Sequence, residues 1–159
     1  MKLKAVFDSC VIATMLAILL IFCADGMPAQ IGREKTFDKQ VAALIAQMLN
    51  KSTEQQAFQD LEVLGCPAVP AMIEQMDDRR ILPDPNISLS NNWPEAFEEK
   101  RSYRPKVVVD ALAAILGQIT GKDFGSIYNG ATEPERKRTI QGWRDYLRKT
   151  PTSKLCGNR

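Results

Sequence analysis

The densest group of charged side chains in the sequence is the run Asp77-Asp78-Arg79-Arg80. Guanidinium groups form bidentate ion pairs with carboxylates, and arginine is enriched among the residues that contribute most to protein–protein binding. The run is therefore a candidate contact surface for another protein. The alternative is that these four residues only form the solvated end of a helix.

Two aromatic residues and an arginine flank the irregular stretch that follows this run. Residues 81–93 carry two prolines and several Asn and Ser residues, which predicts a loop longer than is usual inside a compact domain. Aromatic and arginine side chains are common in binding hot spots, although Trp93 could instead anchor the loop to the core. The predicted partner-binding residues are Asp77, Asp78, Arg79, Arg80, Trp93, Tyr103 and Arg104.

Five carboxylates in the same part of the chain suggest a different chemistry. Two carboxyl groups roughly 5–10 Å apart across a cleft can hydrolyse a glycosidic bond. A glycan hydrolase using a pair among Asp77, Asp78, Glu95, Glu98 and Glu99 is therefore one alternative, and a solvated helix face is the ordinary explanation for the three glutamates.

The chain contains no histidine. This removes the usual general base of serine and cysteine hydrolases and the most frequent zinc ligand. We therefore expect no catalytic residues, no metal and no cofactor, and the sequence favours a protein that is not an enzyme.

The composition is that of one ordinary globular domain. The chain has 159 residues, of which 45% are hydrophobic and 25% charged. The 21 Lys and Arg residues nearly balance the 19 Asp and Glu residues, which gives a net charge of +2. Such a small charge, spread along the sequence, does not favour a nucleic acid as partner. We expect the partner to be another protein.

The N-terminal segment has the layout of a secretory signal peptide. Lys2 and Lys4 precede an apolar run from Val11 to Ala24, which is shorter than the roughly 20 residues that span a bilayer. Small residues then precede a cleavage site after Gly26. We expect residues 1–26 to be removed and the mature protein to be periplasmic or secreted, without contact with the membrane. The alternatives are an uncleaved membrane anchor and a lipoprotein lipidated at Cys23.

Cleavage after Gly26 leaves two of the four cysteines, Cys66 and Cys156. A pair of cysteines in an oxidising compartment favours one disulfide. Two free thiols are the alternative.

The mature chain is expected to be all-α, with about five helices in a compact bundle or short stack. Residues 27–35 read as a polar leader, residues 36–149 as the helical domain and residues 150–159 as a flexible tail. Apolar residues at helical spacing predict the first helix over residues 36–50.

The second and third helices have recognisable ends. Ser52-Thr53-Glu54-Gln55 matches a capping box, in which Ser52 and Gln55 would satisfy free amides at the start of the second helix. Gly65 follows this helix as its C-terminal stop. A third helix follows, with Pro67 and Pro70 in its first turn.

The remaining elements follow the irregular stretch. Residues 94–100 are expected to form a short helix, and a buried fourth helix is expected over residues 105–120. Thr132 and Glu135 match a second capping box, which opens the last helix and carries it to about residue 149. No segment shows a clear alternation of period two, so we expect little or no sheet.

The stretch AFQDLEVLGCPAVPAMIEQM, which covers the second and third helices, resembles a HEAT-type repeat. Gly65, Val69 and Pro70 stand where that repeat has its turn, and Ala68 and Ile73 complete the match. A second unit is recognisable at residues 107–121, and the C-terminal region is similar to the end of some bacterial HEAT-like proteins. The resemblance implies an α-solenoid-like stack of helix pairs that binds proteins.

Together, these observations predict an exported, HEAT-like module that binds another protein and is not an enzyme. An immunity protein that neutralises a secreted toxic effector is the first alternative, since size and export fit it equally. The carboxylate-based glycan hydrolase is the second. The sequence does not specify the oligomeric state.

Overall fold

A computed structural model describes residues 28–84, 86–92 and 97–157, with side chains described from residue 36 onward. The chain divides into two units between residues 35 and 36, and we describe the second by itself. The predicted signal peptide, with Cys23, lies outside the described residues, as do Trp93 and Glu95.

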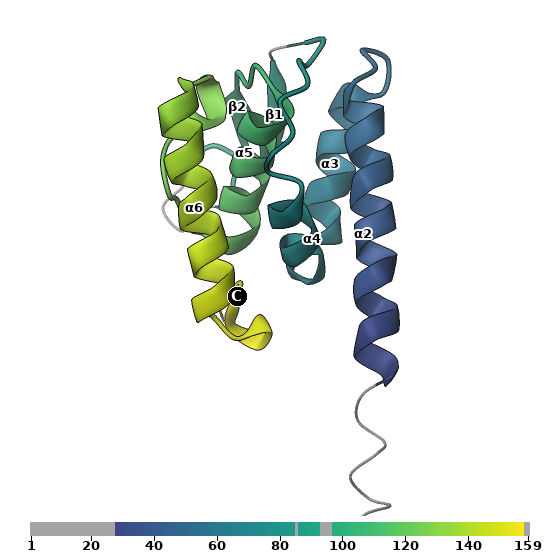
Figure 1. The fold of residues 1–159 in the computed structure, drawn as a ribbon. Coiled ribbons are helices and arrows are strands. Elements are labelled where there is room, and N and C mark those ends of the chain that lie inside the picture. The colour runs from purple at the N-terminus through teal and green to yellow at the C-terminus, as the bar shows by residue number, and fades with distance from the viewer. Residues whose placement is uncertain (1–27, 85, 93–96, 158–159) are drawn as a thin grey trace, which may run out of the picture. The chain divides into compact units, whose positions relative to one another are not determined.

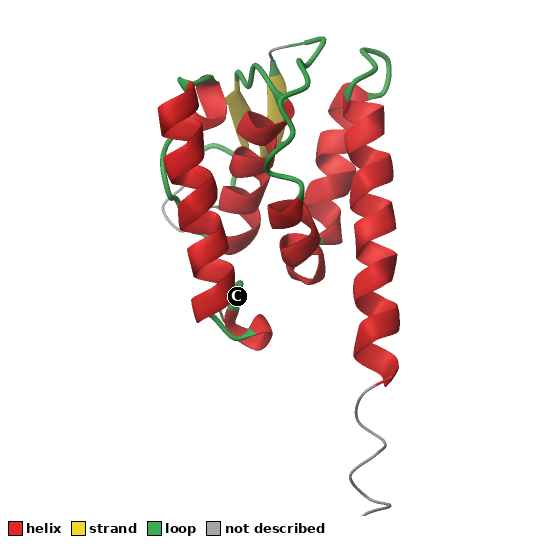
Figure 2. Ribbon diagram, in the orientation of Figure 1, coloured by secondary structure: helices red, strands yellow, loops and turns green. Residues whose placement is uncertain are grey.

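The described chain is mostly helical, with one small sheet (Figures 1 and 2). Its helices are α2 (Pro28–Met48), α3 (Glu54–Leu64), α4 (Val69–Glu74), α5 (Val108–Thr120) and α6 (Glu133–Lys149). Its strands are β1 (Ile87–Ser90) and β2 (Lys100–Tyr103), and its 3-10 turns are η1 (Cys66–Ala68), η2 (Ile127–Asn129) and η3 (Thr152–Lys154). Within these residues, no helix has both the length and the apolar character that a membrane span requires.

Helix α2 begins earlier than the sequence predicted. It starts at Pro28 rather than at residue 36, and proline is favourable in the first helical turn because its missing N–H has no partner there in any case. Most residues from 29 to 35 have high helix propensity, so the helix extends through a polar stretch that lacks an apolar stripe. Further along α2, Val41, Ile45 and Met48 are buried, which confirms the predicted apolar face.

The capping box predicted at the start of α3 is wrong. The Ser52 hydroxyl donates to Asn50 Oδ1 at 2.9 Å, and the Thr53 hydroxyl donates to the Gln47 carbonyl at 2.8 Å. Gln55 does not reach back to the helix start. Its side-chain amide instead bonds both backbone groups of Ser88 in β1, as donor to the carbonyl at 2.8 Å and as acceptor from the N–H at 3.1 Å. The Gln55 side chain thus bonds the backbone of a strand that is distant in sequence, and not the start of its own helix as the local pattern predicted.

The two prolines lie in helical first turns, as predicted. Gly65 ends α3 with φ at +63°, a conformation that glycine adopts without steric cost. Pro67 lies in the turn η1 and Pro70 in the first turn of α4. The predicted third helix is thereby divided into a 3-10 turn and a short α-helix.

A β-hairpin replaces the loop and short helix that the sequence predicted around residues 81–100. Strands β1 and β2 pair antiparallel, with Ile87 opposite Tyr103 and Leu89 opposite Arg101. The short helix is wrong for its described part, because residues 97–99 form a bend and Lys100 begins β2. Ile87 and Leu89 are buried, so β1 does alternate, but over four residues only.

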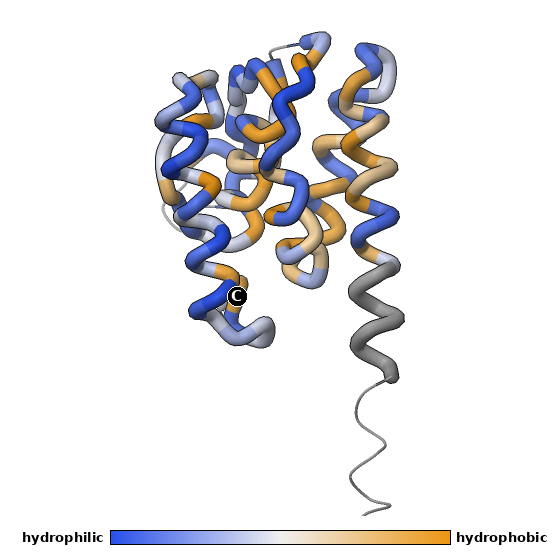
Figure 3. Tube along the Cα trace, in the orientation of Figure 1, coloured by the Kyte–Doolittle hydropathy of each residue, from blue (hydrophilic) through white to orange (hydrophobic). Residues whose placement is uncertain are grey.

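Helix α5 forms the centre of the core. Most of its residues are buried, and it ends at Gly121 with φ at +67°, as the sequence predicted. It packs against α3, α4, α6 and η2. In the hydropathy view, hydrophobic residues gather where α3, α4 and α5 lie, whereas α6 is hydrophilic along most of its length (Figure 3).

Helix α6 begins with the second predicted capping box and packs through aromatic rings. The Thr132 N–H donates to the Glu135 carboxylate at 2.7 Å, which confirms the predicted start. The aromatic cluster of this helix comprises Phe124, Trp143 and Tyr146, with the first two ring centroids 4.8 Å apart.

The C-terminal segment, which the sequence predicted to be a flexible tail, contacts the core through Leu155 and Cys156. Leu155 is fully buried, and its carbonyl accepts a hydrogen bond from the Tyr146 hydroxyl at 2.6 Å. Cys156 forms a disulfide with Cys66, with the two Cα atoms 5.9 Å apart. The predicted pairing is therefore present, and it fixes the tail beside the start of α4.

Candidate partner-binding site around Arg101

Two residues of the predicted contact run form ion pairs with α6. Asp77 pairs with Arg144 at 2.6 Å, and Arg79 pairs with Glu133 at 3.1 Å while also donating to the Met76 carbonyl. Both pairs are largely exposed, so each contributes little to stability. They orient these side chains along α6 and leave them accessible at the surface.

The other two residues of this run pair with each other. Arg80 donates to the Asp78 carboxylate, with Nη2 2.6 Å from Oδ2, and the Arg80 N–H donates to Asp78 Oδ1 at 2.9 Å. Burial works to raise the pKa of Asp78, but the hydrogen bonds from Arg80 outweigh it and keep that pKa below its ordinary value. Asp78 therefore stays ionised and holds the chain as it leaves α4.

Tyr103 and Arg104, which the sequence grouped with Trp93, differ in their burial. Tyr103 is only 3% exposed, and its hydroxyl accepts a hydrogen bond from the Gln118 side-chain amide. Burial raises the pKa of Tyr103. β2 turns the Tyr103 ring toward α5, so this predicted contact residue is buried in the described structure. Arg104 is exposed, and its backbone N–H donates to Asn129 Oδ1 at 2.9 Å.

No ion pair or hydrogen bond of the described residues brings together the carboxylates that a glycan hydrolase would use. Asp77 and Asp78 belong to the two separate arginine pairs described above. Glu98 and Glu99 are exposed in the bend before β2. Across the described part of the chain, no three His, Cys, Asp or Glu side chains come together in a metal-binding arrangement.

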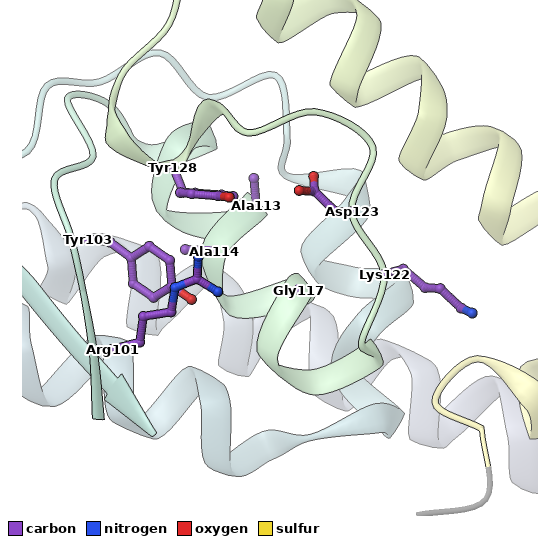
Figure 4. Close-up of a pocket in the computed structure, with 8 residues that line it drawn as sticks. All are labelled: Arg101, Tyr103, Ala113, Ala114, Gly117, Lys122, Asp123 and Tyr128. Carbon is purple, nitrogen blue, oxygen red and sulfur yellow. The ribbon is translucent and has the colours of Figure 1, made fainter. Parts of the chain in front are cut away.

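Arg101, which the sequence did not single out, lies at the centre of a small recess beside β2. Its guanidinium carbon is 5.5 Å from the centroid of the Tyr103 ring and 5.7 Å from that of Tyr128. The two rings meet edge to face, with centroids 5.3 Å apart. The recess is lined by Arg101, Tyr103, Ala113, Ala114, Gly117, Lys122, Asp123 and Tyr128 (Figure 4).

The guanidinium of Arg101 is held by aromatic rings and not by a carboxylate. Among the described residues it makes no hydrogen bond or ion pair. Stacking on tyrosine rings is worth about 0.5–2 kcal/mol and fixes the orientation of the group without using its N–H donors. Arg101 therefore presents a fixed fork of donors that is free to bind an anion.

The acidic residue at the recess is already used within its own loop. The Asp123 carboxylate accepts from the Gly125 N–H at 2.8 Å and from the Ser126 hydroxyl at 3.3 Å. The Ser126 oxygen in turn accepts from the Tyr128 hydroxyl at 3.1 Å. Lys122 is exposed and points away from the recess (Figure 4). Arg101 and Asp123 thus both line the recess, and among the described residues no ion pair joins them.

The dimensions of the recess suit one small group. Its volume is about 10 Å³, which is about the room that one water molecule needs. A wider hollow of about 270 Å³ lies beside residues 124–139, and its carboxylate, Glu135, is used at the capping box of α6. Ligand pockets for small molecules measure roughly 300–1,000 Å³. The Arg101 recess therefore has room for about one water molecule and is far smaller than a small-molecule pocket.

One signal in the sequence could have identified Arg101. Side chains two apart on a strand share a face, so an arginine two residues before a buried tyrosine lies beside that ring. The signal depends on β2 being a strand, which the sequence did not predict.

Comparison with protein-family models, with curated proteins and with solved structures finds no match to this chain.

Proposed function

We propose that this protein is an exported, HEAT-like module that binds another protein through the β1–β2 hairpin and the Arg101 recess. The single observation that carries the proposal is the Arg101 guanidinium, which is stacked on two tyrosine rings and has no anionic partner among the described residues. An arginine fixed in this way loses little entropy on binding, which is a property of binding hot spots.

The arrangement of the helices supports the HEAT-like part of the proposal. Helices α3 and α4 pack against α5, and α4 and α5 both pack against α6. Helices that follow one another in sequence therefore pack around α5, a feature that a short solenoid shares. Helix α6 supplies the partner helix for the second unit suggested by the sequence.

The disulfide supports the export part of the proposal. Disulfides persist in oxidising compartments and are rare where thiols are kept reduced. The Cys66–Cys156 bond joins two segments that are 90 residues apart in the sequence. It is consistent with a mature protein that is periplasmic or secreted.

A crosslinking experiment on the full chain tests the proposal. A photoreactive amino acid replaces exposed Ser102 on the hairpin, and in a control chain it replaces exposed Lys137 on α6. Both chains are irradiated in the envelope of cells that produce the protein naturally. We expect a crosslinked protein from position 102 that disappears when Arg101→Ala is added. The same products from both positions would exclude the hairpin as the binding surface, and products unaffected by Arg101→Ala would exclude Arg101 as a contact.

A further inference from the structure

The two edges of the small sheet differ in how they are covered. On the outer edge of β1, the backbone N–H and carbonyl of Ser88 both bond the Gln55 side chain. The N–H of Ser90 donates to the Glu62 carboxylate at 3.2 Å. Helix α3 thus closes this edge with its side chains, and no further strand can pair there.

The outer edge of β2 is open. In an antiparallel ladder, opposite residues alternate between pairs that exchange hydrogen bonds and pairs that do not. Ser88 lies opposite Ser102, and its backbone groups face α3, so this pair exchanges no hydrogen bonds. The N–H and carbonyl of Ser102 therefore face away from β1. Ser102 is exposed, and no described residue bonds these two groups.

Near its C-terminal end, this edge is closed again. The Arg104 N–H, which lies two residues beyond Ser102, is bonded by the Asn129 side chain. The next strand-edge group in the other direction belongs to Lys100, which is exposed. The open segment is therefore short and centred on Ser102, next to the Arg101 recess.

We propose that this open edge binds an extended acidic segment of the partner protein, which adds to the sheet as a third strand. The inference rests on the proposed function and names the partner's chemistry. Its backbone would bond the N–H and carbonyl of Ser102, and its inward-facing side chain would lie beside Arg101. An aspartate or glutamate at that position meets the free guanidinium at the mouth of the recess.

The charges along β2 favour an acidic partner over a second copy of this chain. Lys100, Arg101 and Arg104 are basic, and residues 100–104 contain no acidic residue. In an antiparallel pairing of two β2 strands about Ser102, Lys100 of one copy would lie opposite Arg104 of the other. Like charges directly opposite each other destabilise a sheet.

The test uses a synthetic peptide of alternating Thr and Glu, about eight residues long, which is the length of an ordinary strand. Two matched peptides serve as controls: one with Lys in place of Glu, and one with Thr and Glu but methylated backbone nitrogens. The full chain is titrated with each peptide while NMR records the backbone amide of Ser102. We expect only the unmethylated acidic peptide to slow hydrogen exchange at this amide.

Variants locate the contacts. Ser102→Pro removes an N–H that takes no part in the β1–β2 ladder, and proline is tolerated at such an edge position. We expect Ser102→Pro to weaken binding of the acidic peptide at least about tenfold, and Ser102→Ala, which keeps the N–H, to leave it unchanged. Arg101→Gln is expected to weaken binding about tenfold as well, because it removes a charged hydrogen-bond donor.

Three results would overturn the inference. Equal binding of the methylated peptide would mean that Arg101 takes a carboxylate without strand addition, which leaves the proposed function intact. Protection of Ser102 that grows with protein concentration in the absence of peptide would identify a second copy as the occupant. No binding of any peptide, although position 102 still crosslinks a natural partner, would exclude an acidic strand but not the proposed function.

Discussion

The buried ion pair between Asp110 and Arg136 offers the sharpest test of how this fold is held together. Asp110 lies in the first turn of α5 and is fully buried. It accepts hydrogen bonds from Arg136 Nε and Nη2, both at 2.8 Å, and from the backbone N–H of Lys106 at 3.1 Å. The pair joins α5 to α6. The hydrogen bonds that Arg136 donates to Asp110 raise the pKa of Arg136 above its ordinary value.

Asp110→Ala removes the carboxylate and leaves four N–H donors without their acceptor, two on Arg136 and the backbone groups of Lys106 and Val107. The Arg136 side chain is only 10% exposed, so water cannot replace the lost partner fully. Breaking one half of a buried, hydrogen-bonded pair costs about 3–5 kcal/mol of unfolding free energy. We expect a loss in this range for Asp110→Ala. Arg136→Met is expected to cost at least as much, because it leaves the fully buried Asp110 carboxylate without its counter-charge.

A double-mutant cycle separates the interaction from the cost of each single change. The free energy of unfolding is measured by urea titration for the wild type, the two single variants and the double variant. The cost of the double variant should fall short of the sum of the single costs by about 1–3 kcal/mol. Arg79→Ala is the matched control, because it breaks an exposed pair with Glu133 and should cost at most about 1 kcal/mol. Additive single costs, or an Asp110→Ala cost no greater than that of the control, would refute this account.

Three further predictions concern the disulfide, a packed glycine and a buried carboxylate. Replacing both Cys66 and Cys156 by Ser should lower the unfolding free energy by about 4–5 kcal/mol, since the bond closes a loop of 90 residues; a loss below about 1 kcal/mol in urea titration would contradict it. Gly142→Ala should cost about 1–3 kcal/mol, because a Cβ there would lie 2.6 Å from the nearest atom of the aromatic cluster. Gly117→Ala is the control, because the nearest atom to a Cβ there is 3.5 Å away, and it should be neutral or stabilising. Both variants are compared with the wild type by thermal unfolding, and equal losses of stability in the two variants would argue against the packing explanation. Burial raises the pKa of Glu54, so ionisation of this carboxyl destabilises the fold as the pH rises through that pKa. Glu54→Gln should therefore stabilise the protein more at about pH 7 than at about pH 4, as measured by urea titration. A gain in stability that is independent of pH would contradict this.

The sequence by itself determined the helices that carry their own start and stop signals. Thr132 and Glu135 form the predicted capping box, and Gly121 ends α5 as predicted. The pairing of Cys66 with Cys156 also followed from the sequence, through the expected loss of the other two cysteines. These features depend on residues close together in the chain, or on a count that leaves one possible pair.

Three features depend on tertiary contacts: the formation of the β1–β2 hairpin, the hydrogen-bond partner of Gln55 and the packing of the C-terminal segment. Strand β1 is four residues long, too short for its alternation to stand out, and it is held by the Gln55 side chain from α3. Leu155 is buried because the disulfide places it against the core. The orientation of Arg101 likewise depends on Tyr128, which lies in a different element. In each case the residue is held by a partner that is distant along the chain. Such a contact stabilises the fold but produces no local sequence pattern from which it could be predicted.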